Sequence, residues 1–219
     1  MVVYWQELSE MVMEGLGVFN LGPYTAQRRE RYPAARQLLM LLISTLPLIY
    51  ILFVWKYMPT LYENTYFVGI CLVLTGLIVF VGDKITDGKK TGGSMSGLDA
   101  MIIGICQTVS AIPGISRTAV TISAGKAVGL RSDYAIRFSF LLYIPAAFGY
   151  CIVSLINSVK AGIDWHSLPK YLVGTAVSIV ASVFILYVFK KLTDKGKSEG
   201  FAYYCWIVGV LVIILTLIF

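Results

Sequence analysis

Long runs of uncharged, apolar residues recur along the chain and are separated by short polar segments. An α-helix needs about 20 apolar residues to cross the hydrocarbon core of a bilayer, and each run is close to that length. The runs end in aromatic, charged or turn-forming residues, as at Trp55-Lys56-Tyr57, which is typical of a membrane interface. The pattern predicts transmembrane helices within residues 38–55, 66–82, 138–159, 171–189 and 201–219.

The stretch 98–130 is also apolar but is interrupted. Pro113-Gly114 breaks it in the middle, and its second half carries Arg117, several hydroxyl groups and Lys126. Each half is roughly 15 residues, or about 22 Å of helix, which is too short for a full crossing. The economical interpretation is a re-entrant helical hairpin that enters and leaves the membrane on one side.

The basic residues support this topology. Of the 18 Lys and Arg residues, 13 fall in four clusters between the predicted spans. If the hairpin is re-entrant, all four clusters lie on the cytoplasmic face, as the positive-inside rule favours. A single crossing would move two clusters to the other side. The clusters are Arg28, Arg29, Arg31 and Arg36; Lys84, Lys89 and Lys90; Arg131 and Arg137; and Lys190, Lys191, Lys195 and Lys197.

Composition narrows the class of protein. Of the 219 residues, 58% are hydrophobic and 14% charged, whereas about a quarter of the residues in a soluble domain are charged. This excludes a soluble enzyme, a disordered tail and a disulfide-stapled secreted module. The four cysteines lie singly without CxxC spacing, so we expect no zinc site and no redox pair. The net charge of +6 follows from membrane topology, so we expect no nucleic-acid partner.

The predicted fold class is therefore all-α and polytopic, with about five transmembrane helices and one re-entrant hairpin. We expect residues 1–37 to form an interfacial helix and a cytoplasmic loop. Residues 38–219 are expected to form a single transmembrane domain, with the hairpin at about 98–130.

Arg117 is the candidate for chemistry. A charged side chain at the centre of a bilayer costs at least about 2.5 kcal/mol and therefore marks a functional site by default. The helix after Pro113-Gly114 begins near Ser116, so its free amides and positive dipole end lie beside the Arg117 guanidinium and nearby hydroxyls. Such a helix start suits a phosphate group. The alternative is that Arg117 snorkels or bonds carbonyls at the end of another helix, while the small residues serve packing.

A family resemblance appears at this segment. Residues 104–125 (GICQTVSAIPGISRTAVTISAG), followed by FSFLL at 138–142 and Ile144-Pro145, resemble the bacterial undecaprenyl-diphosphate phosphatases of the bacitracin-resistance type. The resemblance implies an inverted-repeat fold in which re-entrant hairpins meet near mid-membrane. It also implies the activity, which is removal of one phosphate from the C55 polyprenyl diphosphate that cell-wall synthesis releases.

The same resemblance implies roles for particular residues. Arg117 and Ser116 are expected to be catalytic, and Gly114, Thr118 and Thr121 are expected to bind substrate. A divalent cation, Mg²⁺ or Ca²⁺, is expected to accompany the diphosphate, with no organic cofactor. The expected partners are the polyprenyl diphosphate lipid, the bacterial plasma membrane and a second copy of the chain in a homodimer.

Two features depart from the family pattern. The family's SRSG reads Ser116-Arg117-Thr118-Ala119 here, and the family's first signature, an EGxxEFxPVSSxGH-like hairpin with carboxylates, a serine and a histidine, is not present. The single histidine, His166, lies in a predicted external loop. Two hypotheses remain: a membrane phosphatase, inactive alone if half its site is missing, or a non-catalytic protein that binds or transports a polyprenyl phosphate. Glu10 and Glu14, four residues apart, are the substitutes for the missing carboxylates if the chain alone is active.

Overall fold

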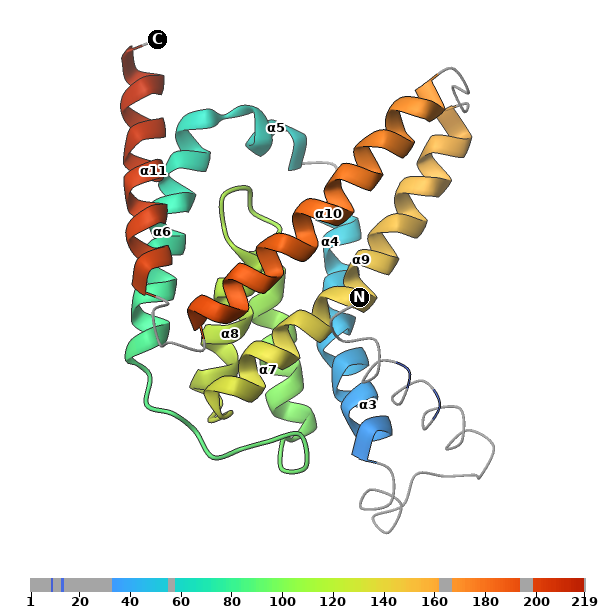
Figure 1. The fold of residues 1–219 in the computed structure, drawn as a ribbon, viewed down its shortest axis with the longest axis vertical. Helices are drawn as coiled ribbons and strands as arrows, with labels where there is room; N and C mark the ends of the chain where they lie inside the picture. Colours follow the sequence, from blue (N-terminus) through green and yellow to red (C-terminus); the bar gives the residue numbers. More distant parts are fainter. Residues whose placement is uncertain are drawn as a thin grey trace.

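The computed structural model describes Ser9, Met13 and residues 33–54, 58–161, 167–193 and 199–218. Within these residues, regular structure is helical apart from one isolated β-bridge, and Figure 1 shows the arrangement. The elements are α3 (Pro33–Thr45), the 3₁₀ helix η2 (Leu46–Leu48), α4 (Ile49–Val54), α5 (Met58–Glu63), α6 (Thr65–Lys84), α7 (Gly97–Val109), α8 (Arg117–Ala127), α9 (Ser132–Ala161), α10 (Leu168–Thr193) and α11 (Glu199–Ile218).

By length and composition, five segments among the described residues can cross a membrane. This confirms the prediction of an all-α polytopic membrane protein. The five segments overlap the five predicted runs, and they are Ala34–Ile51, Thr65–Lys84, Ser132–Lys160, Leu168–Ile185 and Glu199–Ile218.

The start of the first span differs from the expected boundary at residue 38. Helix α3 begins at Pro33, where the fixed φ of proline favours the first turn. Arg36 therefore lies inside a helix and not in a loop, and its guanidinium donates to the Met95 carbonyl over 2.7 Å. The interfacial helix expected in 1–37 falls almost entirely outside the described residues, as do Glu10, Glu14 and His166.

The first span is also not one regular helix. Pro47 lies in η2, between α3 and α4. Because proline has no amide proton and its ring crowds the preceding turn, it interrupts an α-helix. The predicted run 38–55 is accordingly divided into α3, η2 and α4.

Helices α7 and α8 form the predicted hairpin, and both of its ends lie together. The Lys90 amide, before α7, donates to the Gly129 carbonyl over 3.0 Å, and the Arg131 amide donates back to the Lys90 carbonyl over 2.9 Å. In Figure 1 the turn between the two helices lies at the opposite end from these contacts. The chain therefore enters and leaves this stretch at one place, as a re-entrant hairpin requires.

The described loops on either side of the hairpin lie at the same end of the molecule as the start of α11. Lys84 at the end of α6 forms an ion pair with Glu199 at the start of α11, with a separation of 3.7 Å. Ser132, at the start of α9, donates its amide to Asp87 in the loop after α6. These contacts agree with the distribution of charge that the positive-inside rule predicts for a re-entrant hairpin.

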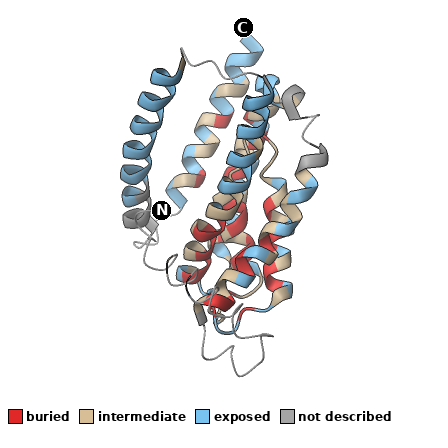
Figure 2. Cartoon of the chain, turned by 90° about the vertical axis from the view of Figure 1, so that its right-hand side faces the viewer, coloured by how far each residue is buried: buried red, intermediate tan, exposed pale blue. Residues whose placement is uncertain are grey.

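The buried core lies in the half of the molecule that contains the hairpin (Figure 2). It joins α3, α7, α8 and the first half of α9, whereas the described side chains of α10 are exposed. Close helix contact in this region depends on small residues, because a Cβ at Gly104 would clash with the Ser44 carbonyl oxygen. The core fixes the hairpin against α3 and α9 and thereby positions its tip.

Candidate anion site at the tip of the hairpin

The turn that joins α7 to α8 packs directly against α6. Gly114 has φ +90°, and a Cβ at this position would lie 2.6 Å from the Val68 carbonyl oxygen and 2.8 Å from Cys71 Cβ. A left-handed backbone and this close approach both require glycine. The predicted role of Gly114 in substrate binding stays a prediction, and its visible role is to seat the turn on α6.

Thr75, in the middle of α6, holds this turn from the side. Its hydroxyl donates to the Gly114 carbonyl over 2.8 Å and accepts from the Ser116 amide over 3.0 Å. The side chain is 2% exposed. Sequence reasoning did not select Thr75, although a threonine among the aliphatic residues of 66–82 is a signal that could have found it.

Ser116 is the N-cap of α8. Its hydroxyl accepts from the Ala119 amide over 3.3 Å, and its own amide donates to the Thr75 hydroxyl. A capping hydroxyl of this kind satisfies one of the unpaired amides at a helix start. The serine hydroxyl keeps its own proton available to donate to an anion.

The Arg117 guanidinium is held by two acceptors. Nε and NH2 donate to the Gln107 side-chain oxygen over 3.1 and 2.7 Å, and NH2 also donates to the Leu142 carbonyl over 2.7 Å. The Tyr143 ring lies against it, with 5.1 Å from Cζ to the ring centroid. Among the described residues, NH1 has no hydrogen-bond partner. The alternative interpretation, in which Arg117 bonds carbonyls at the end of another helix, therefore holds in part. Arg117 does bond a helix carbonyl, but that carbonyl lies in the first half of α9. One guanidinium nitrogen has no partner among the described residues.

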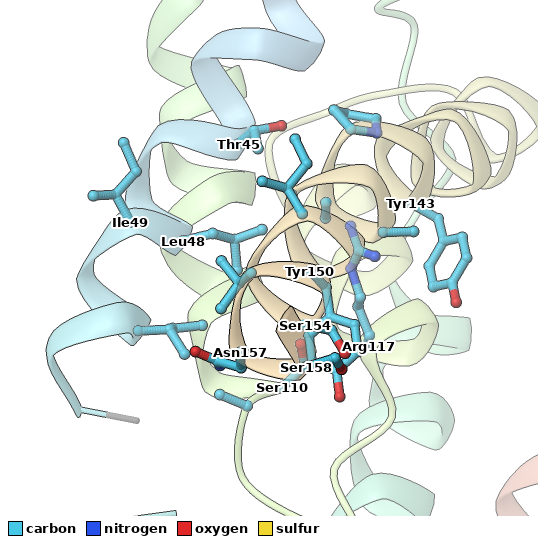
Figure 3. A pocket seen from close by; sticks show the side chains of 18 residues that line it. Thr45, Leu48, Ile49, Ser110, Arg117, Tyr143, Tyr150, Ser154, Asn157 and Ser158 are labelled. Atoms are coloured by element: carbon cyan, nitrogen blue, oxygen red, sulfur yellow. The ribbon is translucent and has the colours of Figure 1, made fainter. Parts of the chain in front are cut away.

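Arg117 lines a cavity of about 980 Å³ between η2 and α4, the tip of the hairpin and α9. Figure 3 shows its side chain in this cavity beside the Tyr143 ring. The walls are mostly apolar, and the polar side chains that join Arg117 there are Thr45, Ser110, Tyr143, Tyr150, Ser154, Asn157 and Ser158. A cationic group in the wall of a mostly apolar cavity suits a ligand with an anionic head and a hydrocarbon chain.

The other predicted site residues do not line this cavity. Thr121 is 2% exposed, and its hydroxyl is bonded to the Arg117 carbonyl and to the Ser139 hydroxyl on α9. Thr118 is partly exposed on the first turn of α8. The hairpin thus brings the predicted residues into one turn and one helix start, but it places only Arg117 of that set on the cavity wall.

The cavity does not by itself fit the expected divalent cation. Of the described residues that line it, none is Asp, Glu or His, and Arg117 adds a positive charge. Mg²⁺ and Ca²⁺ prefer carboxylate and carbonyl oxygens. The cation therefore stays a prediction that the described residues of the cavity do not support.

Charged side chains secure the two ends of the hairpin. Asp99 accepts from the Lys90 ammonium over 2.8 Å and closes a capping box with Ser96 at the start of α7. Lys126, in the last turn of α8, donates to the Gly82 carbonyl over 3.0 Å. Both ends lie away from the tip that carries the anion site, and neither residue contributes to the cavity wall.

Beyond α8, ion pairing fixes the turn into α9. Hydrogen bonds from Ser132 lower the pKa of the Asp87 carboxyl. The Asp133 carboxylate accepts from the Arg131 guanidinium and raises the pKa of that arginine. Asp133 therefore forms an ion pair with Arg131 at the surface.

The fold and site define an integral membrane protein with a cationic group at the tip of a re-entrant hairpin, facing an apolar cavity. The sequence profile described as "Bacitracin resistance protein BacA" matches residues 1–211, and the chain belongs to that family.

Curated relatives agree with this assignment. The chain is 34% identical over 183 residues to the undecaprenyl-diphosphatase of Halothermothrix orenii, which covers 83% of this chain and 70% of that protein. It is 32% identical over 217 residues to undecaprenyl-diphosphatase 1 of Bacillus licheniformis, covering 98% of this chain and 78% of that protein. With the protein of Oceanobacillus iheyensis it is 40% identical over 152 residues, covering 69% of this chain and 55% of that protein.

Proposed function

We propose that this chain acts in the hydrolysis of undecaprenyl diphosphate to undecaprenyl phosphate and inorganic phosphate, which recycles the lipid carrier of cell-wall synthesis. The observation that carries the proposal is the Arg117 guanidinium, which is fixed by Gln107 and Leu142 and presents an unpaired nitrogen at an apolar cavity. Relatives that are 34% and 32% identical to this chain are named undecaprenyl-diphosphatases.

The geometry supports a specific division of labour. Phosphoryl transfer spreads negative charge over the equatorial oxygens of the transferred group, and a fixed cation stabilises that charge. Arg117 supplies the cation on the cavity wall. Ser116, at the adjacent N-cap position, does not line the cavity, and a hydrogen bond from its hydroxyl to the phosphate stays a prediction. The apolar wall formed by residues such as Leu48, Ile49 and Val153 takes the hydrocarbon chain next to the head group.

Hydrolysis also needs a nucleophile and groups that carry protons. The family's first signature, which carries carboxylates, a serine and a histidine, is not present in this sequence. The described residues supply the phosphate clamp, and we expect the remaining groups to come from a polypeptide that carries the first signature.

The experiment measures phosphate release from undecaprenyl diphosphate by the purified chain, with and without a polypeptide carrying the first signature. We expect little release by the chain alone and a clear gain in the mixture. Arg117→Lys, which keeps the charge but loses the planar fork, should remove most of that gain. Lys126→Ala, at the exit of the hairpin, is the control and should leave it nearly unchanged.

Other outcomes separate the alternatives. Robust release by the chain alone would place the missing groups within these residues, with Glu10 and Glu14 as the first candidates. Tight binding of the lipid with no release in either sample would favour a binding or transport protein. Release that is unchanged in Arg117→Lys would contradict the role of Arg117.

The cellular setting is part of the proposal. An integral membrane protein of this family that acts on a cell-wall lipid carrier belongs in the bacterial plasma membrane, with the polyprenyl diphosphate as its partner. A homodimer stays a prediction. The mass of the detergent-solubilised protein, measured by light scattering, tests it.

A further inference from the structure

Gln107 joins the two arms of the hairpin just below its tip. It lies on α7, its side chain is 0% exposed, and its oxygen accepts both Nε–H and NH2–H of Arg117 on α8. This pair of bonds fixes the plane of the guanidinium. The Leu142 carbonyl takes the second NH2 proton, so NH1 keeps two protons for a ligand.

The other end of the Gln107 amide is unpaired. Its Nε2 atom is buried and has no hydrogen-bond partner among the described residues. A buried donor without an acceptor lowers stability, and an apolar side chain of similar size would avoid that loss. That apolar side chain would, however, leave the Arg117 Nε–H without an acceptor, whereas glutamine supplies the acceptor without adding a charge.

The neutrality of the acceptor matters. A carboxylate at the same place would pair with Arg117 and cancel most of its charge, as in a buried ion pair. The amide oxygen orients the guanidinium and leaves its full positive charge for a phosphate oxygen. The Tyr143 ring, 5.1 Å from Cζ, lies against the guanidinium as well.

We infer that Gln107 is the positioning residue of this site, which turns the NH1 edge of Arg117 toward the cavity to bind a phosphate group. The inference rests on the proposed function of Arg117 as the diphosphate ligand. Gln107 acts only through Arg117 and does not itself touch the substrate.

The test compares Gln107→Met with Gln107→Glu. Methionine has similar size and no acceptor, so Arg117 loses its orientation. We expect the affinity for farnesyl diphosphate, a soluble isoprenoid diphosphate, to fall about tenfold. We expect kcat in the reconstituted phosphatase assay to fall on the order of 100-fold. Glutamate keeps the acceptor but cancels the charge, so affinity should fall while the melting temperature stays near that of the wild type.

The matched control is Gln37→Met, because Gln37 lies on α3 and does not line the cavity. It should leave affinity and kcat unchanged. A merely structural role is separated by a double-mutant cycle, in which Gln107→Met should have no further effect on affinity in an Arg117→Met background. Additive effects in that cycle, or wild-type affinity in Gln107→Met, would overturn the inference.

The outcomes also distinguish this inference from the proposed function. A wild-type protein that binds farnesyl diphosphate through Arg117 but never releases phosphate would contradict the phosphatase proposal. In that case the double-mutant cycle of Gln107 and Arg117, measured on affinity, would still decide the role of Gln107. A wild-type protein that releases phosphate while Gln107→Met equals Gln37→Met would contradict only the inference. Wild-type protein that does not bind the diphosphate would overturn both.

Discussion

Thr75 on α6 and Gly114 at the tip of the hairpin are joined by a hydrogen bond of 2.8 Å, and the same threonine hydroxyl accepts from the Ser116 amide. The threonine lies in a predicted transmembrane helix, and the glycine lies in a turn 39 residues later. This contact ties the start of α8, and therefore Arg117, to a helix outside the hairpin.

Replacing Thr75 with valine should loosen the tip. Valine has nearly the same shape but leaves the partly buried Gly114 carbonyl and Ser116 amide without their partner. We expect a loss of about 1–3 kcal/mol in unfolding free energy and lower diphosphate affinity. Thermal unfolding and ligand titration measure the two effects. Thr216→Val is the control, because Thr216 is exposed on α11 and bonds only within its own helix. Equal behaviour of the two variants would show that the Thr75 contact is dispensable.

Gly114→Ala should be more severe. The left-handed backbone alone costs an alanine about 1–2 kcal/mol, and its Cβ would lie 2.6 Å from the Val68 carbonyl oxygen. We expect a lower melting temperature and loss of phosphate release, since the turn must move away from α6. In Gly174→Ala, where the added Cβ meets nothing within 4 Å, the better helix propensity of alanine should leave stability equal or slightly higher. An unchanged Gly114→Ala protein would contradict the described turn.

The hairpin topology predicts a labelling pattern. In a background without the native cysteines, Leu98→Cys and Arg131→Cys should both react with a membrane-impermeant thiol reagent from the cytoplasmic side. Val159→Cys, near the far end of α9 and exposed, should react only from the opposite side. Labelling of the first two positions from opposite faces would contradict a re-entrant hairpin.

Substitutions of the two threonines of α8, Thr118 and Thr121, should have different effects on stability and KM. Thr121→Val removes the hydroxyl contact with Ser139, so we expect about 1 kcal/mol lower stability and an unchanged KM. Thr118→Val should raise KM without a change in stability, since Thr118 is the less buried of the two residues. A raised KM with unchanged stability in Thr121→Val would instead support direct substrate contact by Thr121.

The sequence alone predicted the helical spans, the hairpin and the choice of Arg117 as the candidate functional residue. Membrane helices satisfy their own backbone hydrogen bonds and must have a minimum apolar length, so both properties are local and readable from residue order. A charge such as Arg117 in an apolar stretch is costly wherever it packs. The interruption of the first span at Pro47 is also a local effect, although the sequence analysis predicted one continuous run there.

The tertiary structure decided how the site is assembled. Thr75, Gln107 and Leu142 belong to three different helices, and only the packing of those helices brings them to the turn and to Arg117. The same packing placed the Thr121 hydroxyl against Ser139 and off the cavity wall. A hydroxyl or amide has the same chemistry on any face of a helix, and its partner depends on which neighbour covers that face. That choice is made by long-range contacts, which the order of residues along the chain does not display.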